Sequence, residues 1–109
     1  MPHLRIRAVD LEHVRALSET LAPELATAMN TEIDNFTFEA IPTEFFFNGH
    51  AANGYPFVEV LWFARPQAVQ DYSARIITQQ IKQLTQAPDV VVVFVALSRE
   101  SYYENGEHF

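Results

Sequence analysis

Apolar residues recur with two different periods along this chain, and the order of those periods constrains the fold more than any other feature. Residues 4–8 alternate between apolar and basic side chains, which is the period of a half-buried strand. Asp10 is then a candidate N-cap, and the apolar residues after it lie three or four apart, which predicts a helix to about Asn30. Those helical positions are Leu11, Val14, Leu17, Leu21 and Leu25.

The two periods return in the second half of the chain. An alternating stretch stops at Pro42, and Asn48-Gly49 is a turn signal that follows three consecutive phenylalanines. The predicted elements are a strand at 36–41, a strand at 57–64, a helix that opens with Pro66 and ends before Pro88, and a strand at 90–97. Residues 98–109 form a polar and aromatic tail.

The two predicted helices differ in one respect. Pro23 lies within the first helical pattern, and proline lacks a backbone donor and clashes with the preceding turn. We therefore expect a kink or a break near Leu21, with the helix in two pieces. The second helix has an uninterrupted apolar stripe that we expect to be buried, made of Val69, Tyr72, Ile76, Ile77, Ile81 and Leu84.

The order βαββαβ in 109 residues predicts one α+β domain spanning residues 1–109. Connection rules favour a four-stranded mixed sheet with both helices on one face. The other face would expose Phe57, Leu61, Phe63 and one side of the strand at 90–97. Large apolar patches on a monomer are rare, so this pattern predicts association of several chains.

Composition excludes several classes of function. The chain has 14 acidic and 7 basic residues, so it lacks a basic surface for nucleic acid or for an anionic membrane. It has no cysteine, no dinucleotide or phosphate-binding glycine motif, and no helical histidine pair for a metal. We therefore expect a cytoplasmic protein that uses no cofactor. The three phenylalanines at 45–47 fit a core or an interface better than a ligand pocket.

Three features carry a resemblance to a known family: Met1-Pro2-His3 before an alternating strand, the Phe47-Asn48-Gly49 turn and the aromatic tail. With these features the chain resembles the tautomerase superfamily over its whole length. This family includes macrophage migration inhibitory factor and 5-carboxymethyl-2-hydroxymuconate isomerase. The resemblance implies a trimer of βαββαβ subunits. It also implies that the initiator methionine is removed and that Pro2 becomes the first residue, whose nitrogen acts as a general base.

The proposed role of Pro2 is chemically reasonable. An α-amine titrates near neutral pH, and burial disfavours its charged form, so that a neutral amine is present to accept a proton. If Met1 stays attached, the nitrogen is an amide and has no basicity. The other interpretation of Pro2 is that proline is simply allowed at the start of a strand.

The resemblance also implies residues that hold the substrate. Arg65, at the end of a predicted strand, is the best candidate for binding a carboxylate. The position of the lysine in migration inhibitory factor corresponds here to Asn30 or Thr31, and neither is charged. The position of the polar residue in the last long strand of that protein corresponds to Phe94. Both of those groups are therefore missing from this chain. The candidate substrate-binding residues are Arg65, Phe94, Tyr103 and Phe109, with the last two as apolar walls from the tail.

Three hypotheses about function follow. The first is a cofactor-independent tautomerase or isomerase acting on a small 2-oxo or enol acid, with pockets completed in a homotrimer. The second is a non-catalytic ligand-binding or interaction protein on the same scaffold, and the third is a dimeric ferredoxin-like module. One further expectation concerns assembly: His3, Arg5 and Arg7 share a strand face and would form a charge network with Glu39 and Glu59.

Overall fold

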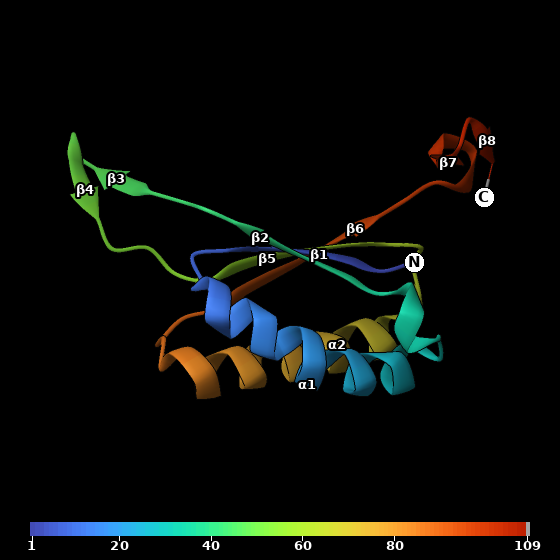
Figure 1. Ribbon diagram of the computed structural model, residues 1–109, viewed down its shortest axis with the longest axis horizontal. Helices are drawn as coiled ribbons and strands as arrows, with labels where there is room; N and C mark the ends of the chain where they lie inside the picture. The colour runs from blue at the N-terminus through green and yellow to red at the C-terminus, as the bar shows by residue number, and fades with distance from the viewer. Residues whose placement is uncertain (109) are drawn as a thin grey trace.

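Two long helices lie side by side against one face of a four-stranded sheet (Figure 1). The computed structural model describes residues 1–108. The sheet consists of β1 (His3–Arg7), β2 (Thr37–Ile41), β5 (Phe57–Trp62) and β6 (Val91–Ala96), in the order β2-β1-β5-β6. β1 is parallel to β2 and antiparallel to β5, and β5 is parallel to β6. The predicted α+β class, the mixed sheet and the helices on one face are confirmed.

Alternation in the strands builds the core between the sheet and helices α1 (Leu11–Met29) and α2 (Gln67–Thr85). Leu4 and Ile6 of β1 are fully buried, while their neighbours in the strand face the other side. Trp62, at the end of β5, is the largest of the fully buried side chains and stacks on Phe94 with ring centroids 4.7 Å apart. The buried hydrophobic residues are Leu4, Ile6, Val14, Leu17, Leu21, Ala22, Leu25, Ala26, Met29, Phe36, Val58, Val60, Trp62, Ile76, Ile77 and Ile81.

α1 is one continuous helix, so the expected division near Leu21 is wrong. Pro23 lies on the exposed side of the helix, where the missing backbone donor faces away from the core. Leu21 and Leu25, on either side of Pro23, are fully buried. Packing of this face over the whole length of the helix outweighs the loss of one hydrogen bond. The helix ends at Asn30, whose left-handed conformation (φ 53°) closes its last turn.

The apolar stripes of the helices are narrower than predicted. Tyr72 and Leu84 of α2 are 52% and 36% exposed, and Leu11 at the start of α1 is 67% exposed. Ser73 of α2 is instead fully buried, because a small side chain lets the helix approach the sheet closely. α2 also begins one residue later than expected, with Pro66 as the residue before its first turn.

Two small hairpins project from the sheet on the side away from the helices (Figure 1). One joins β3 (Phe45–Phe47) to β4 (His50–Ala52), and the other joins β7 (Tyr103–Glu104) to β8 (Glu107–His108). They lie at opposite ends of a molecule whose longest extent is 44 Å. Two short 3-10 turns, η1 (Ile33–Asn35) and η2 (Arg99–Ser101), complete the chain.

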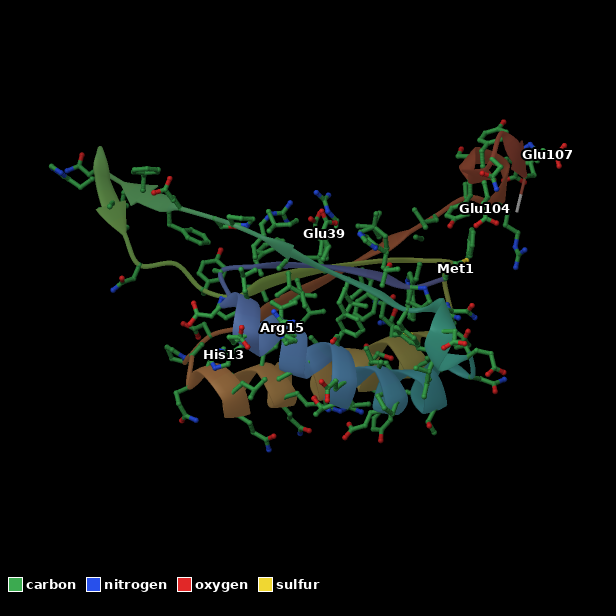
Figure 2. All side chains as sticks on the ribbon, viewed as in Figure 1. Met1, His13, Arg15, Glu39, Glu104 and Glu107 are labelled. Atoms are coloured by element: carbon green, nitrogen blue, oxygen red, sulfur yellow. The ribbon has the colours of Figure 1, made fainter. Side chains whose placement is uncertain are left out.

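The face of the sheet away from the helices carries the expected charge network. His3 Nε2 lies 2.8 Å from Glu39, and Arg5 Nε lies 3.3 Å from the same carboxylate oxygen. Glu59 accepts a hydrogen bond from Arg7 at 2.5 Å, and Arg5 Nη1 lies 3.7 Å from it. Figure 2 shows Glu39 on this open side of the sheet. These pairs lower the pKa of Glu39, chiefly through its hydrogen bond with His3.

Apolar residues lie on the same open face beside the charge network. Val93 and Val95 of β6 are 38% and 37% exposed. The sequence predicts that one side of this strand is exposed in a single chain, and Val93 and Val95 lie on that exposed side. Neither helix of residues 1–108 is both long enough and apolar enough to cross a membrane.

Candidate functional site

The topology of the sheet brings three strand ends together at one end of the molecule. β1 and β5 are antiparallel, with His3 opposite Leu61, so the N-terminus lies beside the residues that follow β5. β5 and β6 are parallel, with Trp62 opposite Ala96, so the residues after β6 arrive at the same place. The backbone hydrogen bond from Leu97 N to the carbonyl oxygen of Trp62, at 2.7 Å, extends this pairing past the strands. Polar residues in these three segments are therefore neighbours.

A pocket of about 390 Å³ occupies this end of the sheet. Its volume lies within the range that small-molecule sites usually have. Figure 2 shows Met1 at this end of the sheet, below the hairpin that carries Glu104 and Glu107. The pocket is lined by Met1, Thr31, Asn35, Phe63, Ala64, Arg65 and Arg99. It therefore combines the start of the chain with two guanidinium groups and the turn after α1.

Pro2 follows Met1, a residue that lines this pocket. The side chain of Pro2 is less than 2% exposed, and its carbonyl oxygen accepts a hydrogen bond from the backbone of Thr37 at 3.2 Å. The ring is thus fixed between β1 and the start of β2. Met1, which is joined to the Pro2 nitrogen, is the residue that reaches the pocket. Removal of Met1 would leave the nitrogen of a rigidly held ring facing the space that Met1 occupies.

Arg65 is held in a fixed position at the pocket wall. Its Nε donates to the carbonyl oxygen of Met29 at 3.2 Å, and its Nη1 donates to that of Phe63 at 2.8 Å. The guanidinium also lies over the Trp62 ring, 5.2 Å from its centroid. Among residues 1–108, Nη2 has no hydrogen-bond partner, so this nitrogen is the one that a ligand can reach. Burial lowers the pKa of Arg65, but a guanidinium stays charged in proteins.

Arg99 is a pocket residue that sequence reasoning missed. It lies in the first position of η2, three residues after β6 ends, and its guanidinium lies over the Phe63 ring at 5.1 Å from the centroid. Tyr102 contacts the same ring with centroids 5.3 Å apart. The signal that could have identified Arg99 is its register, because parallel pairing of β5 with β6 places it near Arg65.

The electrostatics of the pocket act on the N-terminal amine. Burial lowers the pKa of the Met1 amine, and the positive charges of Arg65 and Arg99 lower it further. The same two charges attract anions, which makes the pocket suited to a carboxylate. Among residues 1–108 no three His, Asp or Glu side chains cluster closely enough to hold a metal ion. The site thus has an amine of lowered pKa beside two cations, of which Arg65 is held by two backbone carbonyls.

Phe94 and Tyr103 do not line this pocket. Phe94 packs against Trp62 on the helical side of the sheet. Tyr103 is 59% exposed and stacks on His108, with ring centroids 4.5 Å apart. Phe109 lies outside the described residues. The structure therefore brings together Arg65 and the segment that contains Pro2, and it adds Arg99, Thr31 and Asn35.

Comparison with known proteins identifies close relatives. The family described as "Domain of unknown function (DUF1904)" matches residues 1–108. A DUF1904 domain from Sebaldella termitidis is 41% identical over 100% of both chains, with a TM-score of 0.93. A protein of unknown function from Vibrio cholerae is 48% identical, covers 99% of this chain and 87% of that one, and has a TM-score of 0.88. No curated protein matches the sequence.

More distant solved structures share the fold. Members of the tautomerase superfamily match nearly the whole chain. One of these, described as "F6 fused 4-OT wild type asymmetric trimer", covers 97% of this chain and 94% of its own, with a TM-score of 0.82 and 14% identity. At this level of identity the likeness shows the fold alone, and it confirms the tautomerase-like architecture that the sequence resembled.

Proposed function

This chain belongs to the DUF1904 family, and from its tautomerase-like fold and the pocket at its N-terminus we propose that it is a cofactor-independent tautomerase or isomerase. It moves a proton within a small 2-oxo or enol acid, and the Pro2 nitrogen is the general base. One observation carries this proposal: Met1, which is bonded to that nitrogen, shares a pocket with Arg65 and Arg99.

The proton transfer follows from the chemistry of the amine. After removal of Met1, Pro2 has a secondary amine one residue along the chain from the Met1 amine, whose pKa is lowered by burial and by two cations. The neutral amine takes a proton from the carbon next to the substrate carbonyl, which gives an enol or enolate. The protonated amine then returns the proton to a different atom, so the substrate is isomerised without net gain or loss.

The two arginines hold the acid and stabilise the charge. Nη2 of Arg65 is directed by three contacts of the same guanidinium and is suited to one carboxylate oxygen. Arg99 lies over the Phe63 ring and adds a second positive charge near the developing enolate. Because Arg65 is held by two backbone carbonyls before the substrate arrives, little reorganisation of this group is needed during the reaction.

A homotrimer in the cytoplasm completes the proposal. The open face of the sheet exposes Val93 and Val95 beside charges that are already paired within the chain, and such a face suits contact with further copies. One solved structure with the same fold is described as a trimer. Tyr103, which is exposed in a single chain, would then be available as a wall for a neighbouring subunit.

Ketonization of phenylenolpyruvate, followed by ultraviolet absorbance, tests the proposal. The wild type should accelerate the reaction, and Pro2→Ala should lower kcat/KM by roughly 100-fold, because it replaces the rigid ring amine with a mobile primary amine. Arg75→Ala is the matched control, since Arg75 lies over Tyr72 on α2 and outside the pocket. Equal rates for the wild type and Pro2→Ala would eliminate the proposed mechanism.

A non-catalytic acid-binding protein is the second candidate. The observation that favours it is the tight hold on Arg65 by two backbone carbonyls, which gives this arginine a structural role as well. This candidate predicts binding of a 2-oxo acid that Arg65→Ala and Arg99→Ala both weaken, with no ketonization by the wild type. Calorimetric titration with the same acid separates it from the enzyme.

A further inference from the structure

One wall of the candidate pocket is polar and carries no charge. It is formed by Thr31, the second residue after α1, and by Asn35, the last residue of η1. Both residues are half-buried. Among residues 1–108, the only charged side chains that line the pocket are those of Arg65 and Arg99. The proposed proton transfer uses the N-terminal amine and these two cations, and it gives the neutral wall no task.

The neutral wall is held in place by its own backbone and by the neighbouring cation. Thr31 N donates to the carbonyl oxygen of Ala26 at 3.0 Å, which closes the last turn of α1. The carbonyl oxygen of Met29, the last residue of α1, accepts a hydrogen bond from Arg65 Nε at 3.2 Å. Asn35 follows Thr31 by four residues and bonds to it. The wall is therefore in position before a ligand arrives, which reduces the cost of binding.

The two polar side chains of this wall bond to each other and keep one donor and one acceptor. Asn35 Nδ2 donates to Thr31 Oγ1 at 2.8 Å. Among residues 1–108, no other hydrogen bond involves either side chain, so the proton of the Thr31 hydroxyl and the amide oxygen Asn35 Oδ1 are both available. Rotation of the amide by half a turn reverses this bond, and the pair still presents a donor and an acceptor.

A hydroxyl group is the simplest ligand group that matches such a wall. Its oxygen accepts from Thr31 Oγ1 and its proton goes to Asn35 Oδ1, so every polar group is satisfied. A carboxylate has no proton for Asn35 Oδ1, and its lone pairs would face those of the amide oxygen. A methyl group leaves the donor and the acceptor without partners at a half-buried position, which lowers affinity. The wall therefore distinguishes a hydroxyl from both of these groups.

The two cations serve a single acid group of the ligand. Arg65 Nη1 donates to the carbonyl oxygen of Phe63 at 2.8 Å, and the Arg99 guanidinium lies over the Phe63 ring, 5.1 Å from its centroid. Both charges also lower the pKa of the Met1 amine, so they act at the same point. A 2-oxo acid has its carboxylate and its carbonyl oxygen on adjacent carbons, which suits two cations that meet at one residue. A second carboxylate on the same ligand would have only the neutral wall.

We propose that the substrate is a 2-oxo or enol acid with one carboxylate and one hydroxyl group, and that Thr31 and Asn35 bind the hydroxyl. The acid end of this substrate rests on the proposed function, which assigns it to Arg65 and Arg99. Thr31 and Asn35 determine specificity, and neither takes part in the proton transfer. A pocket of about 390 Å³ is suited to a ligand of this size.

Calorimetric titration of the mature wild-type protein with three acids tests this preference. The acids are 4-hydroxy-2-oxobutanoate, 2-oxopentanoate, which has a methyl group in place of the hydroxyl, and 2-oxoglutarate, which has a second carboxylate. The hydroxy acid should bind roughly 10-fold more tightly than 2-oxopentanoate, the factor expected from two hydrogen bonds. It should also bind more tightly than 2-oxoglutarate. Equal affinities for the hydroxyl and methyl acids, or tighter binding of 2-oxoglutarate, would overturn the proposal.

Two nearly isosteric variants assign the preference to the wall. Thr31→Val removes the hydroxyl and Asn35→Leu removes the amide, so each should reduce the preference for the hydroxy acid to about 2-fold or less, with unchanged affinity for 2-oxopentanoate. Thr31→Ser keeps a hydroxyl and should keep the preference. Thr20→Val is the matched control, because Thr20 Oγ1 donates to Gln80 Oε1 at 2.8 Å outside the pocket. Full preference in Thr31→Val, or its loss in Thr20→Val, would contradict the assignment.

The binding preference and the proposed catalysis fail in different ways. Pro2→Ala should lose ketonization and keep the preference for the hydroxy acid, because the wall is intact. If the proposed function is wrong and this inference holds, the wild type binds the hydroxy acid preferentially and ketonizes nothing. If this inference is wrong and the proposed function holds, the wild type ketonizes phenylenolpyruvate and binds the three acids without preference for the hydroxyl.

Discussion

The two hairpins of this protein have the same turn and different surroundings. Asn48-Gly49 and Asn105-Gly106 each form a two-residue connection, and all four residues have positive φ, between 51° and 82°. This is the requirement of a type I′ turn, which Asn-Gly meets at the lowest cost. The Asn-Gly turns therefore explain why both hairpins form, but they do not explain what each hairpin does.

Contacts distinguish the two hairpins. The tail hairpin is tied to the pocket end of the sheet, because His108 Nδ1 lies 3.2 Å from the carbonyl oxygen of Arg99 and Tyr102 contacts Phe63. The hairpin from Phe45 to Ala52 at the other end, called the arm below, leaves Phe46 and Phe47 exposed. The comparison teaches that one hairpin is tied to the pocket end of its own sheet, whereas the other leaves its aromatic side chains exposed.

Arg99→Ala, which tests the contact between the tail hairpin and the pocket, should have the largest effect. Loss of a fixed guanidinium beside the reacting group should lower kcat/KM for phenylenolpyruvate by roughly 100-fold, about 3 kcal/mol of transition-state stabilisation. His50→Ala in the arm, a residue that does not line the pocket, should change kcat/KM by less than about 2-fold. A loss of similar size in both variants would show that the two hairpins do not have separate roles.

A matched pair of glycine substitutions, each with an expected effect of intermediate size, tests the comparison between the two hairpins. A Cβ at Gly49 or Gly106 meets no atom within 4 Å, so alanine at either position brings only the strain of a positive φ. That strain is about 1 kcal/mol, or roughly 5-fold. Gly106→Ala should raise KM by this factor with unchanged assembly, and Gly49→Ala should weaken assembly with unchanged KM at saturating protein. Sedimentation and steady-state rates measure both, and the reverse pattern would contradict the assignment.

The pH dependence of kcat/KM should distinguish a variant near the tail hairpin from a variant in the arm, because only the first changes the charge near the N-terminal amine. A base works above its pKa, and Arg99 helps to lower the pKa of the N-terminal amine, after burial and Arg65. Arg99→Ala should therefore move the acidic limb of the kcat/KM profile to higher pH, so that activity falls more at pH 6 than at pH 9. Gly49→Ala should leave the limb in place. A profile for Arg99→Ala that superimposes on the wild type would exclude this electrostatic role.

The smallest expected effect concerns the turn that leads into the tail hairpin. Ser98 Oγ donates to Glu100 at 2.6 Å and lowers the pKa of that carboxyl. Ser98→Ala should return the pKa of Glu100 toward its ordinary value, as measured by carbon-detected NMR titration. Glu39, on the open face of the sheet, is the comparison carboxylate, and its pKa, which His3 lowers, should be the same in both proteins. An unchanged Glu100 would show that this hydrogen bond is absent in solution.

Much of the fold could be predicted from the sequence because its elements repeat clear periods. Parity along the strands placed His3, Arg5 and Arg7 on the face that carries Glu39 and Glu59, and the structure confirms these pairs. The arm was harder to predict, because three consecutive phenylalanines hide the alternation of a strand. The strands of the tail hairpin have only two residues each, too few to show a period.

The candidate site was predictable only in part. Pro2 and Arg65 adjoin recognisable elements, so their position relative to the sheet follows from the pattern. Arg99 required the pairing of β5 with β6, a long-range contact that no local period reveals. The course of α1 through Pro23 likewise depends on packing by residues far away in the chain.

Labelling with 2-oxo-3-pentynoate, an alkyne conjugated to a 2-oxo acid, tests the central claim most directly. The chain has two kinds of amine that can add to the alkyne, the N-terminus and the exposed side chain of Lys82. Peptide mapping of the mature protein at neutral pH should show that Met1 is absent and that Pro2 carries one reagent molecule, with Lys82 unlabelled. Retention of Met1, or labelling of Lys82 as fast as of Pro2, would contradict the assignment of Pro2 as the working base.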